Sequence, residues 1–140
     1  MSSVPNNTDK SKKKTIHIGK YVLTQRRPIG SGTFAKVYKA QHETNGILVA
    51  IKAISREKVN LNAKHQANLK SEIAILRKLK HNNIVRLFDI ESSGKHVYLI
   101  LEYCGGGDLS TFVKQNGPLP EFKARRLILQ LAAGLEFLHS

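Results

Sequence analysis

Three kinds of residue occur in an order that could hold a nucleotide. Gly30 and Gly32 lie in "IGSGTFAKVYKA" (residues 29–40), Lys52 ends "VAIK" (residues 49–52), and Glu72 follows 20 residues after the lysine. Glycine lets the backbone approach phosphates closely, and lysine supplies a positive charge. A carboxylate can hold a flexible ammonium group in place. The pattern therefore predicts a site for a phosphorylated ligand.

The glycine segment differs from two other phosphate-binding motifs. A dinucleotide-binding GxGxxG loop leads from a strand into a helix and is followed about 20 residues later by an acid. Here Ala35 replaces the third glycine, the strand-like "KVYKA" follows, and Lys52 stands 22 residues after Gly30. No GK[ST] sequence completes a Walker motif. We therefore expect a glycine loop that joins two antiparallel strands and covers phosphates.

Lys52 and Glu72 are expected to meet across the core. Alternation along a strand places Ala50 and Lys52 on one face, and a half-buried lysine requires an anionic partner. Glu72 has no basic partner three or four residues away on its own predicted helix. The alternatives are a lysine that reaches solvent from a strand edge and a glutamate at the helix boundary.

The elements that must position these residues can be read from periodicity and turn residues. Asn45–Gly46 between two β-rich runs predicts a hairpin, and the apolar spacing over residues 59–80 predicts one amphipathic helix. A short helix over "DLSTFVKQ" and a last helix from Glu121 with one apolar face follow. Five strands are expected at residues 21–29, 36–43, 47–54, 83–91 and 96–103.

Composition limits the class of protein. The chain has 140 residues, 41% hydrophobic and 24% charged, which is typical of a globular domain. Its net charge of +13 attracts polyanions, but the charges are dispersed and accompany no nucleic-acid motif. The single cysteine allows no internal disulfide, and the histidine and cysteine spacing predicts no metal site. No apolar run suggests a signal peptide or membrane span, so we expect a cytoplasmic protein.

Together the motifs resemble the N-terminal lobe of a eukaryotic protein kinase over roughly residues 21–139. "HNNIVRL" and the hinge-like "EYCGGGDL" join the glycine loop, VAIK and the helix glutamate in this resemblance. It implies an α+β fold: a five-stranded antiparallel sheet with one regulatory helix, a hinge, and the first two helices of a helical C-terminal lobe. The implied divisions are a disordered basic tail (1–16), the N-terminal lobe (17–101), the hinge (102–108) and the first C-lobe helices (109–140).

The family's site residues can be assigned by position. The resemblance gives catalytic roles to Lys52, which would contact the α and β phosphates of ATP, and to Glu72, which would hold it. Val37 and Ala50 would cover adenine, and Leu101 stands at the gatekeeper position. The full set of positions implied to bind ATP is Ile29, Gly30, Ser31, Gly32, Thr33, Phe34, Val37, Ala50, Lys52, Leu101, Glu102, Cys104 and Asp108.

Three of these positions have specific implied roles in holding the nucleoside. Main-chain groups of Glu102 and Cys104 would bind the adenine edge, so their side chains need no special chemistry. Asp108 matches a position that often binds ribose hydroxyls. Phe34 would stand at the tip of the glycine loop. No residue of this chain is expected to bind magnesium, which the complete kinase would hold elsewhere.

Within the family, the quoted segments look most like the Unc-51-like Ser/Thr kinases that initiate autophagy, especially the plant type. The resemblance implies ATP, protein substrates and autophagy regulators as partners. The catalytic-loop aspartate and the DFG motif have no counterpart in the sequence, so we expect the chain alone to be inactive. The alternatives are a pseudokinase-like binding module and, less favoured, a basic nucleic-acid-binding protein.

Overall fold

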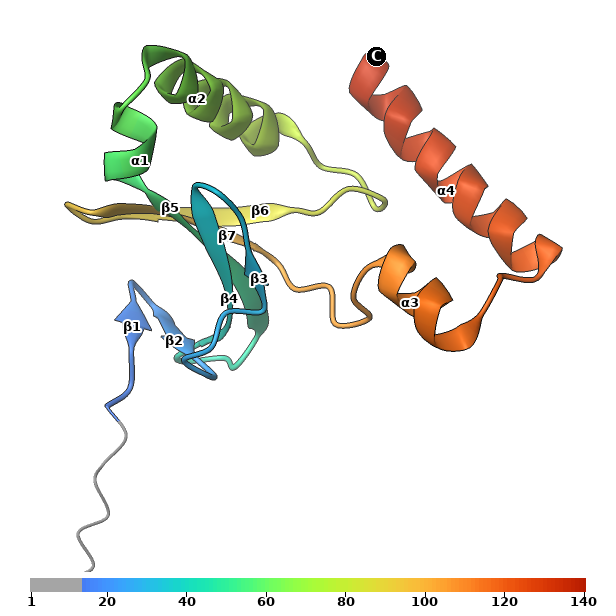
Figure 1. Cartoon of the computed structure of the whole chain (residues 1–140), viewed down its shortest axis with the longest axis horizontal. Coiled ribbons are helices and arrows are strands. Elements are labelled where there is room, and N and C mark those ends of the chain that lie inside the picture. The colour runs from blue at the N-terminus through green and yellow to red at the C-terminus, as the bar shows by residue number, and fades with distance from the viewer. Residues whose placement is uncertain (1–13) are drawn as a thin grey trace, which may run out of the picture.

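The computed structural model describes residues 14–140, and the predicted basic tail, residues 1–16, lies outside this range except for its last three residues. A curled antiparallel sheet forms one part of the molecule, and helices α3 and α4 form the other (Figure 1). The sheet order is β1 (His17–Ile18), β2 (Tyr21–Leu23), β4 (Ala35–His42), β5 (Leu48–Ser55), β7 (His96–Glu102) and β6 (Leu87–Ser92), with β3 (Gly30–Ser31) paired only to β4.

The five-stranded sheet expected from the sequence is present, with three differences. The first expected strand, residues 21–29, ends at Leu23, and the chain pairs again only at β3. A short strand, β1, forms a hairpin with β2. The strand expected at residues 83–91 begins only at Leu87. The sheet that carries the glycine segment is therefore confirmed. Its first expected strand is interrupted between Leu23 and Gly30, which periodicity did not predict.

Both faces of the sheet are covered by apolar packing. On one face, under the β1–β2 hairpin, Ile51 and Ile100 are fully buried. On the opposite face Leu99 is fully buried, and Leu69, Ile73 and Leu76 of α2 (Ala63–Lys78) pack against that cluster. Full burial of one Leu or Ile side chain stabilises a fold by about 1.5–3 kcal/mol. This packing holds α2 against the face of the sheet that carries Lys52.

The helix predicted over residues 59–80 is in fact two helices, α1 (Arg56–Asn60) and α2. The physical reason is a second capping residue inside the predicted span. Asn62 has an extended backbone, and its Oδ1 accepts a hydrogen bond of 2.8 Å from the amide of Lys64. An asparagine in this conformation starts a helix rather than continuing one. Ser55 caps α1 by accepting from the amide of Lys58.

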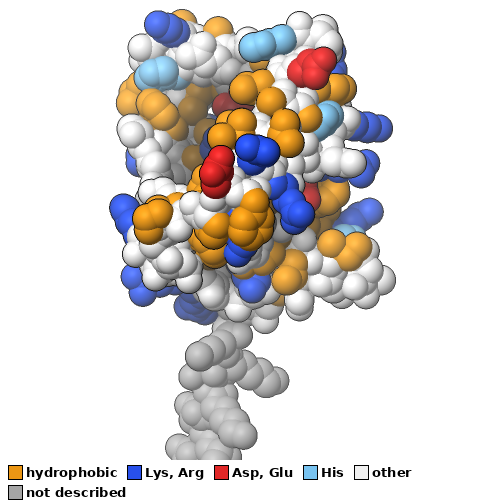
Figure 2. Space-filling view, turned by 90° about the vertical axis from the view of Figure 1, so that its right-hand side faces the viewer, with side chains coloured by type: hydrophobic (Ala, Val, Ile, Leu, Met, Phe, Trp, Pro, Cys, Tyr) orange, Lys and Arg blue, Asp and Glu red, His pale blue; other side chains and the backbone are white. Residues whose placement is uncertain are grey.

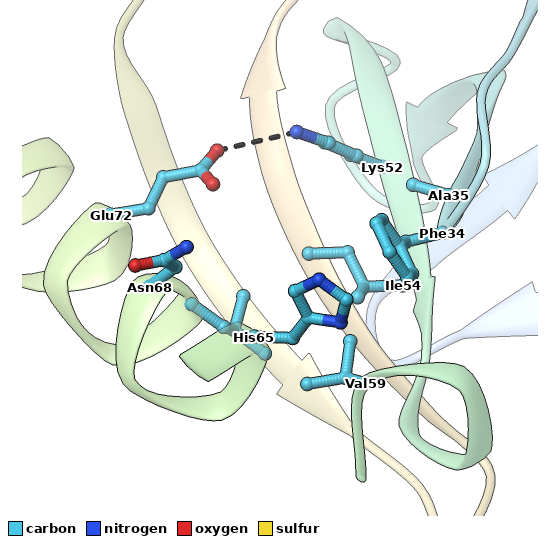
Figure 3. A pocket seen from close by; sticks show the side chains of 9 residues that line it. Phe34, Ala35, Lys52, Ile54, Val59, His65, Asn68 and Glu72 are labelled. Carbon is cyan, nitrogen blue, oxygen red and sulfur yellow. Dashed lines mark hydrogen bonds and ion pairs between the residues drawn. The ribbon is translucent and has the colours of Figure 1, made fainter. Parts of the chain in front are cut away.

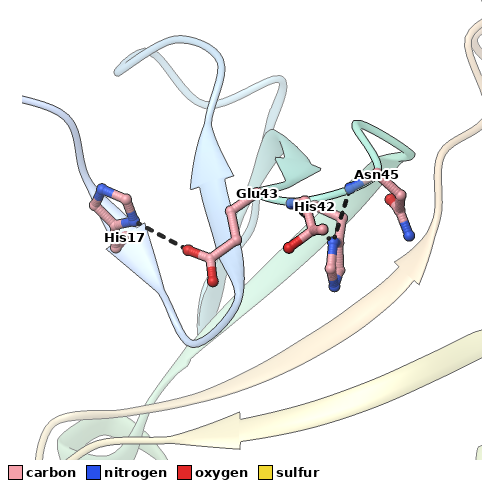
Figure 4. Close-up of polar contacts among 5 residues, drawn as sticks. His17, His42, Glu43 and Asn45 are labelled. Carbon is pink, nitrogen blue, oxygen red and sulfur yellow. Dashed lines mark hydrogen bonds and ion pairs between the residues drawn. The ribbon is translucent and has the colours of Figure 1, made fainter.

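The hairpin predicted at Asn45–Gly46 joins β4 and β5 and is confirmed. Gly46 has a φ of +70°, which favours glycine, and Asn45 Oδ1 accepts from the amide of Ile47 at 2.9 Å. His42 Nδ1 accepts from the amides of Thr44 and Asn45 on the same turn (Figure 4). The register set by this turn places residue 37 opposite residue 52.

The two expected C-terminal helices are also present, as α3 (Leu109–Asn116) and α4 (Glu121–His139). Gly117, at a φ of +80°, ends α3. Asn83 fixes α4 to the loop before β6, because its Nδ2 donates to Gln130 O at 2.9 Å. Several apolar side chains of α4 nevertheless face solvent, and Figure 2 shows apolar side chains at the surface on the side of the molecule where α3 and α4 lie. They include Ile128, Leu131, Leu135 and Leu138.

Across residues 14–140, no helix combines the length and the apolar character that a bilayer crossing requires. The boundaries proposed at residues 101 and 108 between lobe, hinge and helices remain predictions. In the structure, the segment between β7 and α3 makes this connection.

Candidate functional site

The glycine segment forms a loop between two antiparallel strands, as its sequence context predicts. Gly30 pairs with Val37 and Ser31 with Lys36, and the amide of Gly32 donates to Ala35 O at 2.8 Å. The amide of Ile29 adds a bond of 2.7 Å to Val37 O. Two further bonds hold the far side of the loop. Ser55 N donates to Phe34 O at 3.0 Å, and Lys58 Nζ donates to Thr33 O at 3.4 Å.

Gly30 and Gly32 are not required by the fold itself. Neither has a positive φ. A Cβ atom at Gly30 would lie 3.7 Å from the Cβ of Val37, and one at Gly32 would lie 3.8 Å from Ala35 O, which are ordinary contacts. Without a side chain at these two positions, the main chain of the loop stays accessible to a neighbouring molecule. A ligand that approaches the main chain closely gives a physical reason for both glycines.

Lys52 and Glu72 meet as expected. Lys52 Nζ lies 3.2 Å from Glu72 Oε1, and the two side chains are 33% and 47% exposed. The lysine comes from β5 and the glutamate from α2, so the sheet-to-helix packing sets their separation (Figure 3). An ion pair this exposed contributes at most about 1 kcal/mol to folding. Its geometric effect is larger, because it fixes an ammonium group that is still accessible to a ligand.

A cavity of about 200 Å³ lies between the glycine loop, β5 and α2. Its walls include Phe34, Lys52, Asn68 and Glu72, and Figure 3 shows their side chains around it. His65 of α2 closes one end, where its ring meets that of Phe34 at a centroid distance of 4.6 Å. The loop and the helix that carries Glu72 are therefore in direct contact.

Sequence reasoning did not identify His65 as part of this site. Its Nδ1 atom is buried and has no hydrogen-bond partner among the described residues. A signal for it exists in the sequence, because residue 65 precedes Glu72 by two helical turns and so shares its face. The expected helix contained both residues, but pairing with Phe34 depends on how the loop folds back.

The predicted adenine-covering residues lie on the same face of the sheet as Lys52. Val37 pairs with Lys52 across β4 and β5, and Ala50 pairs with Leu101 across β5 and β7. All four side chains are half-buried. Leu101, at the expected gatekeeper position, therefore lies beside Ala50, one of the two positions expected to enclose a flat ring. Lys39 adds a contact that the sequence did not suggest, with its Nζ 4.9 Å from the centre of the Tyr103 ring.

Of the two positions expected to bind the adenine edge, Glu102 ends β7 and Cys104 lies in the segment that follows. The amide of Glu102 donates to Arg86 O at 2.8 Å, and the Glu102 carboxylate accepts from the amide of Arg86 at 3.2 Å. The Cys104 carbonyl accepts from Gly107 N at 3.2 Å. Among residues 14–140 the amide of Cys104 donates to no protein acceptor. This amide can therefore donate to a ligand.

Asp108 has a structural role that the sequence analysis did not assign. It is the N-cap of α3, and its Oδ1 accepts from the amide of Thr111 at 2.7 Å. Hydrogen bonds from the backbone N–H of Thr111, and secondarily from its side chain, lower the pKa of the Asp108 carboxyl group. Asp108 lines a different cavity from Lys52, beside Phe112 and Arg126. Its assignment to ribose stays a prediction, and capping is the role visible in the structure.

Within the described part of the chain, no three His, Cys, Asp or Glu side chains gather as a metal site would require. The site on this chain therefore consists of a backbone loop, one cation held by one carboxylate, and an apolar face. This arrangement can bind and orient a phosphorylated ligand. Its described residues include no group of acids to hold a divalent cation.

Comparisons with known proteins agree with this geometry. Residues 23–140 match the model of the protein kinase domain family. The chain is 48% identical over 121 residues to serine/threonine-protein kinase ATG1c of Arabidopsis thaliana. The aligned region covers 86% of this chain and 16% of that protein. It is 40% identical over 127 residues to serine/threonine-protein kinase ULK1 of Homo sapiens, covering 90% of this chain and 12% of that protein.

A second Arabidopsis relative, serine/threonine-protein kinase ATG1b, is 49% identical over 122 residues. The chain spans about one-sixth of the length of the two Arabidopsis relatives. The expected kinase fold and the resemblance to this group of Ser/Thr kinases are both confirmed. The chain belongs to the protein kinase family and is similar to its ATG1 and ULK members.

Proposed function

We propose that this chain is the ATP-binding part of a Ser/Thr protein kinase. The observation that carries the proposal is the 3.2 Å contact between Lys52 Nζ and Glu72 Oε1, beside a glycine loop whose glycines the fold does not require. The held ammonium group would contact the α and β phosphates of ATP, while main-chain groups of the loop approach the same phosphates. Both effects increase affinity for a triphosphate over a neutral nucleoside.

The adenosine end would be held by residues on the same face of the sheet. Val37 and Ala50 would cover adenine, and Leu101 would limit the depth of the pocket. The amide of Cys104, which donates to no protein acceptor among residues 14–140, would donate to the ring edge together with main-chain groups of Glu102. Ile29, Ser31, Thr33 and Phe34 would form the remainder of the loop cover. Asp108 would reach ribose only with the carboxylate oxygen that does not cap α3.

We also propose which parts of the reaction lie outside this chain. Bound magnesium neutralises charge on the phosphates and bridges them during phosphoryl transfer. Its ligands, and the aspartate that orients the substrate hydroxyl, would be supplied by other segments of the longer protein. This is supported by the small share of each relative that the chain spans. The 140-residue chain alone would therefore bind ATP without transferring its phosphoryl group.

The full-length protein would phosphorylate Ser or Thr residues of protein substrates. Its similarity to ATG1 and ULK kinases supports a role in autophagy, with autophagy regulators as partners and the cytoplasm as its location. A pseudokinase-like binding module is the second candidate, and the solvent-facing apolar side chains of α4 favour it. Phosphoryl transfer to a protein substrate by the full-length protein, abolished by Lys52→Met, would decide for the kinase.

ATP binding by the chain itself can be measured by titrating it with ATP and following backbone amide signals by NMR. Lys52→Met removes a charge-assisted hydrogen bond and should weaken binding by about tenfold or more. Lys78→Met, on the exposed side of α2, makes the same chemical change away from the site and should leave affinity within about twofold. Equal losses in both variants would show that ATP binds only through overall charge and would contradict the proposal.

A further inference from the structure

A second polar pocket lies on the other side of the glycine loop, on the opposite face of the sheet from Lys52. The register places Lys36 opposite Ala53 and Tyr38 opposite Ile51, whereas Val37 pairs with Lys52. Successive side chains of a strand point to opposite faces, so Lys36 and Tyr38 face away from the ATP-binding face. The pocket there has a volume of about 250 Å³.

Several cationic and hydroxyl groups surround this outer pocket. Lys36 and Tyr38 come from β4, Ser55 from the end of β5, Lys58 from α1, and His96 from the start of β7. The pocket thus gathers two ammonium groups, an imidazole and two hydroxyl groups from segments as far apart as residues 36 and 96. All of these can donate hydrogen bonds to one anion.

The positive charge of the outer pocket is not neutralised within the described part of the chain. No carboxylate lines the pocket, and none of its three basic residues takes part in an ion pair within residues 14–140. Glu91, on the neighbouring strand β6, pairs with Tyr98, and its carboxylate lies against Gly19 in the β1–β2 turn. Glu57 adjoins Lys58 in sequence but does not line the pocket.

Local contacts hold three of the residues around this pocket, Ser55, Lys58 and His96. Lys58 Nζ donates to Thr33 O at 3.4 Å, and Ser55 Oγ accepts from the amide of Lys58 at 3.4 Å. The His96 ring stacks on Tyr98 with a centroid distance of 5.6 Å and an interplanar angle of 28°. Groups held in this way lose less conformational entropy on binding than free surface lysines do.

We infer that the outer pocket binds a phosphate group. A phosphate dianion offers several acceptor oxygens, which match the two ammonium groups, the imidazole N–H and the hydroxyl groups of Ser55 and Tyr38. The group can be free phosphate or the phosphate of a phosphorylated serine side chain, because the recognition chemistry is the same. The pocket's side chains from β4 and β7 lie on the other face of the sheet from Lys52, and Gly32, Phe34 and Ala35 of the glycine loop complete its lining.

The test uses the ¹⁵N-labelled full chain without nucleotide, at constant ionic strength. One titration uses inorganic phosphate, and another uses a short peptide containing phosphoserine, with its unphosphorylated form as control. We expect saturable shifts of the amides of Ala53, Ser55 and Lys58, and none with the unphosphorylated peptide. Lys36→Ala/Lys58→Ala should weaken the affinity by at least about tenfold, because two charge-assisted hydrogen bonds are lost.

A matched double variant controls for overall charge. Lys78→Ala/Lys114→Ala removes the same charge from exposed positions outside the pocket and should bind phosphate as the unaltered chain does. Equal weakening in the two double variants, or shifts that do not saturate, would mean an adventitious ion only and would overturn the inference. Loss of the shifts in Lys52→Met would place the phosphate at the ATP-binding face and would overturn it as well. Tighter binding of the phosphopeptide than of inorganic phosphate would support a phosphoserine source, and equal binding would support the free anion.

Discussion

Substitution of Glu72 separates the folding role of the Lys52–Glu72 pair from its binding role. The side chains are 33% and 47% exposed, so the attraction between them is screened by water. Glu72→Ala should lower the free energy of unfolding by less than about 1 kcal/mol. The same change should affect nucleotide binding more strongly, because it releases the ammonium group proposed to contact the phosphates of ATP.

The size of the binding effect follows from the freedom that Lys52 regains. A lysine side chain carries about 2 kcal/mol of rotamer entropy, and part of it is already lost in the 3.2 Å contact with Glu72. If half or more of that ordering must instead occur on binding, affinity for ATP falls by about 5- to 30-fold. Glu72→Gln keeps an acceptor oxygen without the charge, so its affinity should lie between those of the unaltered chain and the alanine variant.

Two measurements on the same samples check this expectation. Urea unfolding gives the stability change, and a titration with ATP gives the affinity change. Glu57→Ala, which removes an exposed glutamate from α1, is the matched control and should change neither quantity appreciably. A stability loss of about 3 kcal/mol or more in Glu72→Ala would show that the pair mainly supports the fold. Unchanged ATP affinity would refute the reasoning about lysine positioning.

Three further expectations concern the fold that positions the site. Ile51→Ala should lower the free energy of unfolding by about 2–5 kcal/mol in a urea titration, because this side chain is fully buried in the sheet. Gly46→Ala should cost about 1 kcal/mol or more at a φ of +70°, whereas Gly94→Ala, in open space without a positive φ, should be nearly neutral in the same assay. The pKa of Asp108 is lowered by Thr111, so Asp108 should stabilise the fold above the ordinary pKa of an aspartate, and this stabilisation should disappear as pH falls through the lowered value. Unfolding measured against pH should show that difference between the unaltered chain and Asp108→Ala, and parallel pH curves would contradict it.

Sequence patterns predicted the sheet and its site-bearing strands because the signals there are local and mutually consistent. The Asn45–Gly46 turn sets the β4–β5 register, and this register alone places Val37 opposite Lys52. The error over residues 59–80 has a different origin. The apolar residues that predicted this helix begin only at Leu69, so they cannot show that Asn62 has an extended backbone and caps a new helix.

Sequence reasoning predicted the contact between two residues, Lys52 and Glu72, but it missed the contact that depends on how three segments are placed together. Lys52 and Glu72 could be paired because an unpartnered carboxylate beside an apolar helix face seeks a cation. The contact between Phe34 and His65 requires the glycine loop, β5 and α2 to be placed together, and no local pattern encodes that placement. The outer pocket has the same character, since Lys36 and Lys58 read as solvated surface residues until the β4–β5 register and the position of α1 bring them around one space.

Ala35 shows why the glycine count of the loop was a poor guide to its function. The residue begins β4, pairs with Ile54, and has no positive φ, so the backbone there can carry a side chain without strain. Its methyl group packs against the cluster that includes Val59 and Leu99, and the carbonyl of Ala35 accepts the bond from Gly32 that closes the loop. A glycine at this position would lose that contact and gain backbone freedom in a strand. The two glycines that remain are those whose absent side chains the fold does not explain, so the pattern of this loop is the one that a ligand, rather than a turn, would require.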